Sequence, residues 1–229
     1  MIEVITMWYN ESFLAPYFLR HYAFADQITI FFDGATTDDS LLQINKYKEC
    51  PVNIIPFEFE DGLDELIKIG YFNEAYRKSK ADWVIIADAD EFVFVEKLKG
   101  KYYFVDLYQV TAFETLDIDK PIRQANYGFL DFQFRKPSVV KTGLSFHWEP
   151  GHHEAYFKGR KVVFAPILQG AHWNWITLDF VINRLLNNRA PRQSQENIDN
   201  NFDHQYNNLT KEKITEEYYI RKSKCRKLW

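Results

Sequence analysis

The sequence predicts an α/β protein in which helices flank a mixed sheet, and three observations predict it. In the first ninety residues, short apolar runs rich in β-branched residues alternate with stretches of helical spacing, which is the pattern of parallel βαβ units. These runs are nearly continuous, as expected for strands that are covered on both faces. After Glu91 the extended runs follow one another without intervening helices, so we expect an antiparallel region to complete the sheet.

Four strands and three helices are expected in the first half, residues 1–95. Apolar residues at helical spacing predict the helices over 13–22, 41–47 and 63–75. The predicted strands are Glu3–Met7, Gln27–Phe32, Val52–Phe57 and Trp83–Ala87.

The second half is expected to be mostly extended and to end in a helix that begins at Ile176. Its predicted strands are Lys101–Phe113, Phe129–Phe134, Val139–Lys141 and Lys161–Leu168. The polar stretch 191–208 is expected to be a loop. No linker rich in Pro, Gly or Ser separates the halves, so we expect one domain over 1–205, with halves 1–95 and 96–205. A polar and basic tail or helix over 206–229 follows it.

The composition excludes several classes of protein. The chain has 229 residues and a formal charge of −4, from 28 basic and 32 acidic side chains. A nucleic-acid-binding protein would need a basic excess. No apolar run approaches the roughly 18 residues of a membrane span, and the first residues show no signal-peptide pattern. Two cysteines do not indicate a disulfide framework. We therefore expect a cytoplasmic globular protein without a nucleic-acid partner.

Polar and acidic side chains follow each of the four strands predicted in the first half. In open α/β sheets, ligands bind at the carboxyl ends of parallel strands. Carboxylates that crowd together there repel one another unless a cation or a hydrogen-bonding ligand compensates them. The side chains in question are Asn10, Glu11, Asp33, Glu58, Glu60, Asp88, Asp90 and Glu91.

The Asp88-Ala89-Asp90 triplet is the strongest candidate for a metal site. In an extended chain, residues i and i+2 face the same side, so both carboxylates would point together. Mg²⁺ and Mn²⁺ take carboxylate oxygens together with phosphate oxygens of a substrate. The alternative is an acidic loop that caps a strand. The apolar segments on either side, Trp83–Ala87 and Phe92–Phe94, would bury such a loop, which favours the metal site.

Three segments resemble motifs of the family 2 type of glycosyltransferase. They are Asn10-Glu11, Asp33–Ser40 and Asp82–Phe92, in the order and spacing of that family; Thr37 is a mild departure within the second. The resemblance covers residues 1 to 95. It implies a GT-A type, Rossmann-like fold, with a nucleotide-sugar-binding first half and an acceptor-binding second half. It also implies a nucleoside-diphosphate sugar donor, with UDP-sugar favoured, a glycan acceptor, bound Mn²⁺ or Mg²⁺, and inversion at the sugar.

The resemblance also implies roles for particular residues. Asp33 would hold the nucleoside, Asp88 would lie near the ribose or the metal, and Asp90 would bind the metal directly. His172, in a Gly-Ala-His-Trp element before the last predicted helix, would approach the metal or the diphosphate. Donor-binding residues implied in this way are Asn10, Glu11, Asp33 and Asp88.

Positive side chains in the second half are candidates for binding the leaving diphosphate. Charge develops on that group when the anomeric bond breaks, and a cation stabilises it. Arg184 and Arg189, in or just after the predicted helix, are the donor-binding candidates, with Lys141 as a third. The alternative for each is a solvated surface.

A general base must take the proton from the acceptor hydroxyl. His153 and Glu154 are the catalytic candidates, and the residues alone do not rank them against Asp131 or Asp179; we select Glu154. Adjacent histidines in an extended chain, such as His152 and His153, point to opposite faces, which argues against a zinc hydrolase.

Aromatic side chains concentrate around the histidines of the second half, over residues 146–175. Their flat faces suit sugar rings, and Trp148 and Trp173 are the acceptor-binding candidates; core packing is the alternative for both. The basic end of the chain is a candidate for peripheral contact with an anionic membrane. The competing functions are a catalytically silent carbohydrate-binding or nucleotide-binding module and a sugar-nucleotide nucleotidyltransferase.

Overall fold

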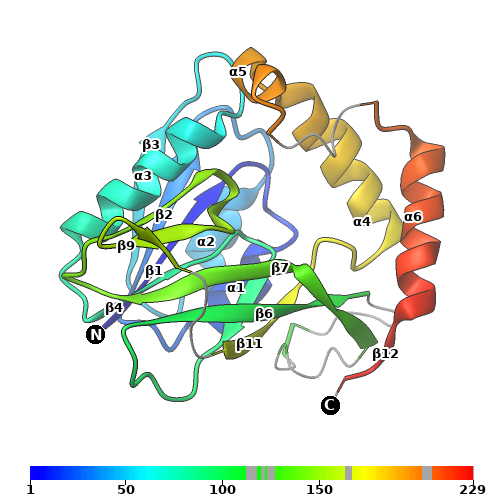
Figure 1. Ribbon diagram of the computed structural model, residues 1–229. Coiled ribbons are helices and arrows are strands. Elements are labelled where there is room, and N and C mark those ends of the chain that lie inside the picture. Colours follow the sequence, from blue (N-terminus) through cyan, green and yellow to red (C-terminus); the bar gives the residue numbers. More distant parts are fainter. Residues whose placement is uncertain (112–117, 120–121, 123–126, 163–166, 203–207, 229) are drawn as a thin grey trace.

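The computed structural model describes residues 1–111, 118–119, 122, 127–162, 167–202 and 208–228 (Figure 1). Its strands are β1 (Ile2–Trp8), β2 (Gln27–Asp33), β3 (Val52–Phe57), β4 (Trp83–Ile86), β5 (Glu91–Phe94), β6 (Tyr102–Val110), β7 (Tyr127–Lys141), β8 (Phe146–Trp148), β9 (Ala155–Phe157), β10 (Arg160–Lys161), β11 (Ile167–His172) and β12 (Arg226–Lys227). Its α-helices are α1 (Ala15–His21), α2 (Ser40–Tyr47), α3 (Glu65–Lys78), α4 (Leu178–Ile182), α5 (Gln195–Asp199) and α6 (Lys211–Lys224).

One mixed sheet of the described strands forms the centre of the protein, in the order β3-β2-β1-β4-β7-β6-β11-β5, with β12 paired to β7. Strands β3, β2, β1 and β4 are parallel. Strand β7 then runs antiparallel to both β4 and β6. Strands β8, β9 and β10 form a separate small sheet. The predicted mixed α/β sheet flanked by helices is therefore confirmed.

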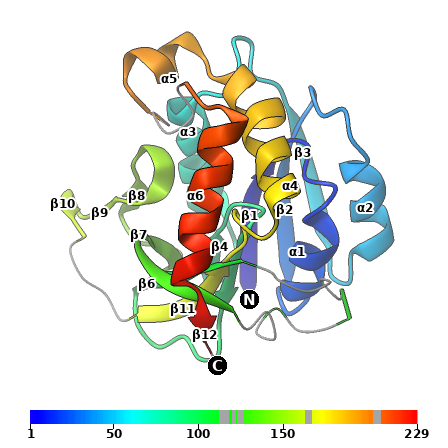
Figure 2. The same ribbon diagram turned by 90° about the vertical axis from the view of Figure 1, so that its right-hand side faces the viewer.

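The first half follows the predicted order of strands and helices. Alternate residues of β1 enter different cores: Val4 packs with α1 and α2 on one face, and Ile5 packs with α3 on the other. Figure 2 shows α1 and α2 on one side of the sheet and α3 on the opposite side. Helix α3 begins after Asp64, whose side chain accepts the amide protons of Leu66 and Ile67. Burial on both faces explains the long apolar runs of β1, β2 and β4, whereas β3, at the edge of the sheet, has no fully buried residue.

The second half departs from the prediction in three places. The two strands expected between Phe129 and Lys141 are one continuous strand, β7. Strand β11 runs parallel to β6, although only antiparallel pairing was expected. The stretch expected to be a loop contains the short helix α5, which begins after the capping side chain of Ser194. The pairings of β7 and β11 join residues far apart in the chain, so local composition does not specify them.

The helix expected from Ile176 begins at Leu178 as α4, which continues into a π-helical segment, Asn183–Arg189, and a 3₁₀ turn, Ala190–Arg192. The end of the first strand predicted in the second half, residues 112–113, lies outside the described residues. So do positions 163–166 of the strand predicted at Lys161–Leu168, and the domain boundary expected at 205/206.

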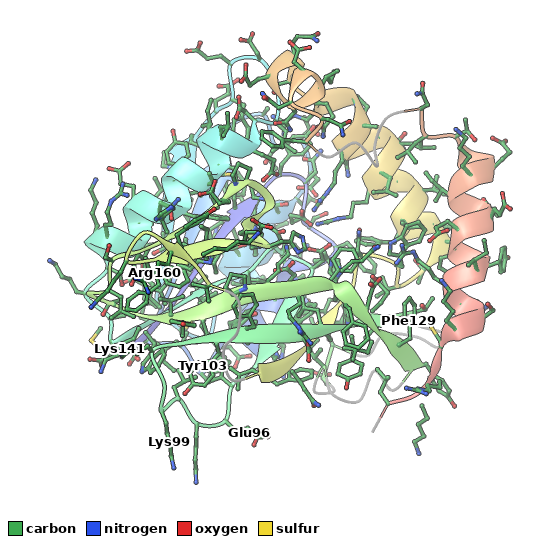
Figure 3. All side chains as sticks on the ribbon, viewed as in Figure 1. Glu96, Lys99, Tyr103, Phe129, Lys141 and Arg160 are labelled. Carbon is green, nitrogen blue, oxygen red and sulfur yellow. The ribbon has the colours of Figure 1, made fainter. Side chains whose placement is uncertain are left out.

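Helix α6 packs against the rest of the protein. Its buried residues Ile214 and Tyr218 join Trp175, Val181 and Leu185 in a third core. Figures 1 and 2 both show α4 and α6 side by side at one edge of the molecule. In Figure 3, Phe129 of β7 lies beside the end of α6, where the Lys224 amine is 5.8 Å from the ring centroid. Among the described helices, none is long and apolar enough to cross a membrane.

Candidate active site

The candidate site lies at the carboxyl ends of β1, β2 and β4. Strand β1 is paired to β2 on one side and to β4 on the other, although β4 comes much later in the chain. The strand order therefore reverses between β1 and β4. Such a reversal leaves a crevice at the carboxyl ends of these two strands. The loop after β1 carries Asn10 and Glu11, β2 ends at Asp33, and the turn after β4 carries Asp88 and Asp90. The predicted meeting of polar groups is confirmed for the ends of β1, β2 and β4; Glu58 and Glu60, after β3, do not line the cleft described below.

Asn10 connects the loops that follow β1 and β2. Its backbone φ is 52°, a left-handed conformation that asparagine tolerates better than most residues. Its Oδ1 accepts the amide protons of Thr37, at 2.8 Å, and of Asp38, at 3.2 Å. Asn10 thus holds the loop that follows Asp33.

Asp33 is fully buried and faces a cation that the sequence analysis did not predict. Its Oδ2 is 2.8 Å from Nη2 of Arg192, and its Oδ1 accepts the amide proton of Ala35. The Arg192 guanidinium lies 3.6 Å from the ring centroid of Tyr9. Asp33, Arg192 and Tyr9 therefore form one side of the rim, next to the end of β2.

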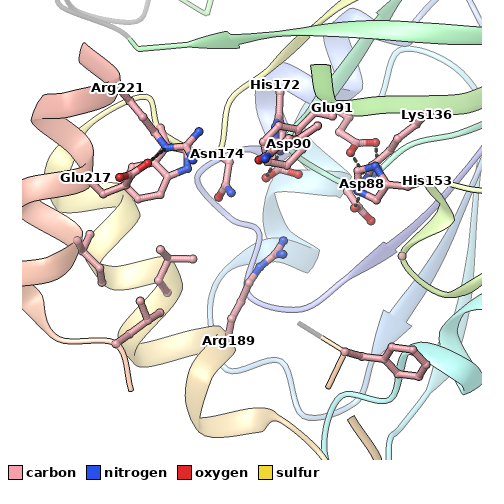
Figure 4. Close-up of a pocket in the computed structure, with 18 of the residues that line it drawn as sticks. Asp88, Asp90, Glu91, Lys136, His153, His172, Asn174, Arg189, Glu217 and Arg221 are labelled. Atoms are coloured by element: carbon pink, nitrogen blue, oxygen red, sulfur yellow. Dashed lines mark hydrogen bonds and ion pairs between the residues drawn. The ribbon is translucent and has the colours of Figure 1, made fainter. Parts of the chain in front are cut away.

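Asp88 and Asp90 lie in a turn between β4 and β5, and not in an extended chain as predicted. The two carboxylates therefore have different partners. Figure 4 shows Asp88 beside Lys136, and Asp90 beside His172. The predicted side-by-side arrangement of the two carboxylates is wrong in this respect, because the turn breaks the alternation on which it depended.

The Asp88 cluster contains Lys68, Lys136, Glu91 and His152. Lys136 Nζ is 3.3 Å from Asp88 Oδ2, 2.5 Å from Glu91 Oε1 and 2.9 Å from His152 Nε2. Lys68 Nζ is 3.2 Å from Asp88 Oδ1. Burial favours the protonated form of Asp88, but Lys68 and Lys136 outweigh it and hold its pKa well below the usual value. Burial likewise lowers the pKa of Lys136, but Glu91 and Asp88 raise it more.

The Asp90 cluster contains Arg184, Glu11 and His172. Asp90 Oδ2 is 3.3 Å from His172 Nε2 and 3.4 Å from Arg184 Nη2. The other terminal nitrogen of Arg184 pairs with Glu11. Burial opposes ionisation of Asp90, yet Arg184 and then His172 keep its pKa far below the usual range. For Glu11, burial outweighs Arg184, and its pKa is raised. Arg184 thus joins β1 to the turn after β4.

A cleft of about 990 Å³ opens beside both clusters. Its walls include Asp88, Asp90, His153 and Arg189, and on the opposite side residues of α6. In Figure 4, Arg189 projects from its helix into this space, between Asn174 and the two aspartates, while Arg221 of α6 faces it from across the cleft. The size suits a drug-sized or cofactor-sized ligand, for which roughly 300–1,000 Å³ is usual.

His153 is the catalytic candidate that lines the cleft. Burial, together with the nearby Lys136 and His152, lowers the pKa of His153 to about 3, so the imidazole is neutral at neutral pH. The structure does not bring Glu154 to the rim. Its carboxylate pairs at 2.5 Å with Lys161 on the small sheet, and both side chains are about half exposed.

The two tryptophans selected for acceptor binding belong to the core. Trp148 is 1% exposed and donates its indole proton to the carbonyl of Pro137 at 2.7 Å. Trp173 is 2% exposed and packs between Tyr17 and Phe92. Neither ring offers a free face to a sugar, so core packing accounts for both. The tryptophan that lines the cleft is Trp175.

Asp90 and His172 are ligand types that a divalent cation accepts, and the Arg184 guanidinium lies 3.4 Å from the same Asp90 oxygen. The carboxylate oxygen and imidazole nitrogen converge at 3.3 Å, and Mn²⁺ accepts both kinds of ligand. In the described part of the chain, one group of three acidic and histidine side chains also converges: Asp88, Glu91 and His152, with ligand atoms within 4.8 Å of one another. That group already surrounds Lys136, so it fits an added metal less well.

Sequence reasoning missed Lys68, Lys136 and Arg192. Each lies far in the chain from the carboxylate that it neutralises, so no local motif connects the pair. One signal was present for Lys136: it is a base shortly before the apolar pair Val139-Val140, where a buried charged side chain requires a partner.

Three comparisons relate the chain to known proteins. No protein-family model matches the sequence, and no curated protein matches it. Among solved structures, TarS from S. aureus resembles the chain with a TM-score of 0.47 and 13% sequence identity, over 97% of this chain and 43% of that one. The chain therefore spans less than half the length of TarS.

Two further structures resemble the chain. TarS residues 1–349 in complex with UDP matches at 13% identity over 96% of this chain and 71% of that chain, with a TM-score of 0.47. Glucosyl-3-phosphoglycerate synthase from Mycobacterium tuberculosis, in complex with Mn²⁺, UDP and glucosyl-3-phosphoglycerate, matches at 16% identity over 40% of this chain and 34% of its own, with a TM-score of 0.30.

Proposed function

We propose that the protein is a metal-dependent glycosyltransferase, which moves a sugar from a nucleoside-diphosphate donor, UDP-sugar being favoured, to a hydroxyl of a glycan acceptor. One observation carries the proposal: Asp88 and Asp90 of the predicted motif and Arg189 of the late helix line one large cleft at the end of β4, with Arg184 behind Asp90. That position is where open α/β sheets bind nucleotides.

The donor diphosphate is proposed to lie between the two aspartates and Arg189. Arg189 projects into the cleft, and its planar guanidinium suits phosphate oxygens (Figure 4). Asp90 and His172 would hold the divalent cation, Mn²⁺ or Mg²⁺, which supplies neutralising charge for the leaving diphosphate when bound. Arg184 orients Asp90 and Glu11, because it contacts both carboxylates. Asp33 would bind the nucleoside.

The acceptor is proposed to enter from the side of α6. Ile220 provides exposed apolar surface there and Asn174 a hydrogen-bonding group. The Arg221 guanidinium covers the Trp175 ring and pairs with Asp131 and Glu217. His153 lies on the same cleft wall and is neutral, so its imidazole can accept a hydrogen bond from an acceptor hydroxyl; its pKa of about 3 makes it a weak base. Transfer with inversion remains what the resemblance implies, and the anomeric coupling constant of the product in an NMR spectrum tests it.

Nucleotide binding is the direct test of the proposal. A thermal-shift screen of UDP and other nucleoside diphosphates, each with and without Mn²⁺, should raise the melting temperature for one base, and more with Mn²⁺. A ligand at about 100 times its Kd adds about 2.7 kcal/mol to the free energy of unfolding. Arg189→Gln should reduce the shift. Arg160→Gln, at an exposed arginine of β10, should leave it unchanged. No shift with any nucleotide contradicts the proposal.

Donor hydrolysis separates an enzyme from a silent binding module. With Mn²⁺ and the donor that binds, a glycosyltransferase should slowly transfer sugar to water, and Asp90→Asn should abolish that release. Binding without any turnover, with or without an acceptor, would instead favour the silent module.

Membrane contact through the basic end of α6 stays a prediction. Because α6 packs in the third core, replacing Lys222 and Lys224 by glutamate is a gentler test than deleting the helix. Co-sedimentation with anionic liposomes should fall in that variant, and equal pelleting of both proteins contradicts the contact.

A further inference from the structure

The three-residue group Asp88, Glu91 and His152 has the composition of a metal site. Its two carboxylate oxygens and one imidazole nitrogen lie within 4.8 Å of one another, and Glu91 and His152 are each 1% exposed. Oxygen and imidazole ligands of this kind bind Mn²⁺ or Zn²⁺ in many proteins.

A lysine ammonium already lies among these three ligands. Lys136 Nζ is 2.5 Å from Glu91 Oε1, 2.9 Å from His152 Nε2 and 3.3 Å from Asp88 Oδ2. Metal ions bind such atoms at about 2.0–2.2 Å. An ion bound to the same three atoms would therefore lie against the ammonium group, and like charges at that separation in a buried site repel strongly.

The strand register explains why the lysine is there. Strand β7 pairs antiparallel with β4, and Val139 lies opposite Ile85. The paired segment ends there; Asp88 lies three residues beyond Ile85 and Lys136 lies three residues before Val139, so both come at the same end of the β4–β7 pairing. Lys136 is 4% exposed and lines the cleft beside Asp88. The β4–β7 pairing therefore brings the ammonium close to Asp88.

We propose that Lys136 is the resident cation of the Asp88–Glu91–His152 group. It keeps divalent ions out of this group and confines them to Asp90 and His172, and it holds Asp88 in position at the cleft. Lys136 is thus a positioning residue that separates two neighbouring carboxylates into different roles. The second site, Asp90 and His172, rests on the proposed function, whereas the occupancy of the first group by lysine does not.

Counting bound Mn²⁺ tests the proposal without any activity assay. Free Mn²⁺ measured by electron paramagnetic resonance should show one ion per wild-type chain. Lys136→Met keeps the length of the side chain and removes its charge, so it should bind one additional ion. Lys136→Arg keeps the charge and should stay at one. Lys68→Met is the matched control, because it removes the other ammonium of Asp88 but not the one among the three ligands; it should gain no ion.

A folded Lys136→Met protein that binds no more Mn²⁺ than the wild type overturns the proposal. If that variant does not fold, the Mn²⁺ affinity of His152→Asn, which retains Lys136, tests the proposal instead. The proposal expects an Mn²⁺ affinity within about twofold of wild type, because His152 is not a ligand. A loss of tenfold or more in His152→Asn means that the ion binds the three-residue group, and overturns the proposal.

Failure of the proposed function would appear differently. In that case the wild type binds neither Mn²⁺ nor any nucleoside diphosphate. The gain of an ion in Lys136→Met would still establish the role of Lys136.

Discussion

Asp88 and Asp90 lie two residues apart in the chain, but different parts of the molecule neutralise them. Asp88 contacts two amines, Lys68 from α3 and Lys136 from β7, on its two carboxylate oxygens. Asp90 shares one oxygen between the guanidinium of Arg184 and the imidazole of His172. Each cluster contains an imidazole and a cation, but in the Asp88 cluster an ammonium lies 2.9 Å from the imidazole nitrogen, whereas at Asp90 the imidazole of His172 contacts the carboxylate directly.

This difference indicates that the role of each carboxylate depends on partners distant in sequence. The turn after β4 presents both groups to the same cleft, and a motif of alternating aspartates would suggest one shared ion. Lys136 of β7 contacts Asp88, and Arg184 of the late helix contacts Asp90, so different elements determine the role of each carboxylate. Changing a partner should therefore affect one cluster and leave the other nearly intact.

Asp90→Asn should have the largest effect of the changes considered. It removes a proposed metal ligand and one carboxylate partner of Arg184, so transfer or donor hydrolysis should fall by about 10³-fold, about 4 kcal/mol in the activation barrier. Mn²⁺ affinity should fall with it. Asp88→Asn should change Mn²⁺ affinity by less than about threefold. Equal losses of Mn²⁺ affinity in the two variants would remove the distinction between the clusters.

Arg184→Met should destabilise the fold by about 3 kcal/mol, because it leaves Glu11 and Asp90 buried without their nearest cation. Urea unfolding measures this loss. Adding Glu11→Gln should recover part of it, since one buried charge is then gone. Lys136→Met should cost about as much, because it leaves buried Glu91 without the ammonium at 2.5 Å, although Lys68 still faces Asp88 at 3.2 Å. If Lys136→Met costs more than Arg184→Met, the Asp88 cluster is the more dependent on a single cation.

Much of the first half could be predicted from sequence because its information is local. Continuous apolar runs specify buried parallel strands, and the polar residues after them fall at one rim, as Asp33 and Asp90 do. Lys136 could not be placed in this way: it comes near Asp88 because β7 pairs with β4, a pairing that joins residues more than fifty positions apart. Trp148 and Trp173 show the same limit, since composition alone does not tell a buried aromatic from one that faces a cleft.

The pH dependence of stability should reveal how burial and the neighbouring Lys136 and His152 lower the pKa of His153. Burial, Lys136 and His152 lower the pKa of His153 to about 3, whereas in the unfolded chain it is about 6.5. Below pH 6.5 the unfolded chain therefore binds a proton that the folded protein does not. The free energy of unfolding should fall as the pH drops from about 6.5 toward 3, by up to about 1.4 kcal/mol per pH unit.

Urea unfolding in the presence of EDTA, at pH values from 7 to 4.5, measures this slope for metal-free protein. His153→Asn should flatten the profile, because the difference in bound protons between the unfolded and folded states then falls by one. Lys136→Met should shift the folded pKa of His153 upward, because it removes one of the repelling charges. A profile unchanged in both variants would show that His153 titrates normally and is not near these cations.

Glu154→Gln should have the smallest effect, although the sequence favoured Glu154 as the general base. Its carboxylate pairs with Lys161 at the surface, and exposed pairs of this kind contribute little to stability. Transfer and donor hydrolysis should stay within about twofold of wild type. His153→Asn should slow transfer to an acceptor while leaving nucleotide binding intact, because the imidazole lines the cleft next to the Asp88 cluster. A loss of turnover in Glu154→Gln that matches the loss in His153→Asn would mean that the small sheet closes over the cleft during the reaction and carries Glu154 to the acceptor.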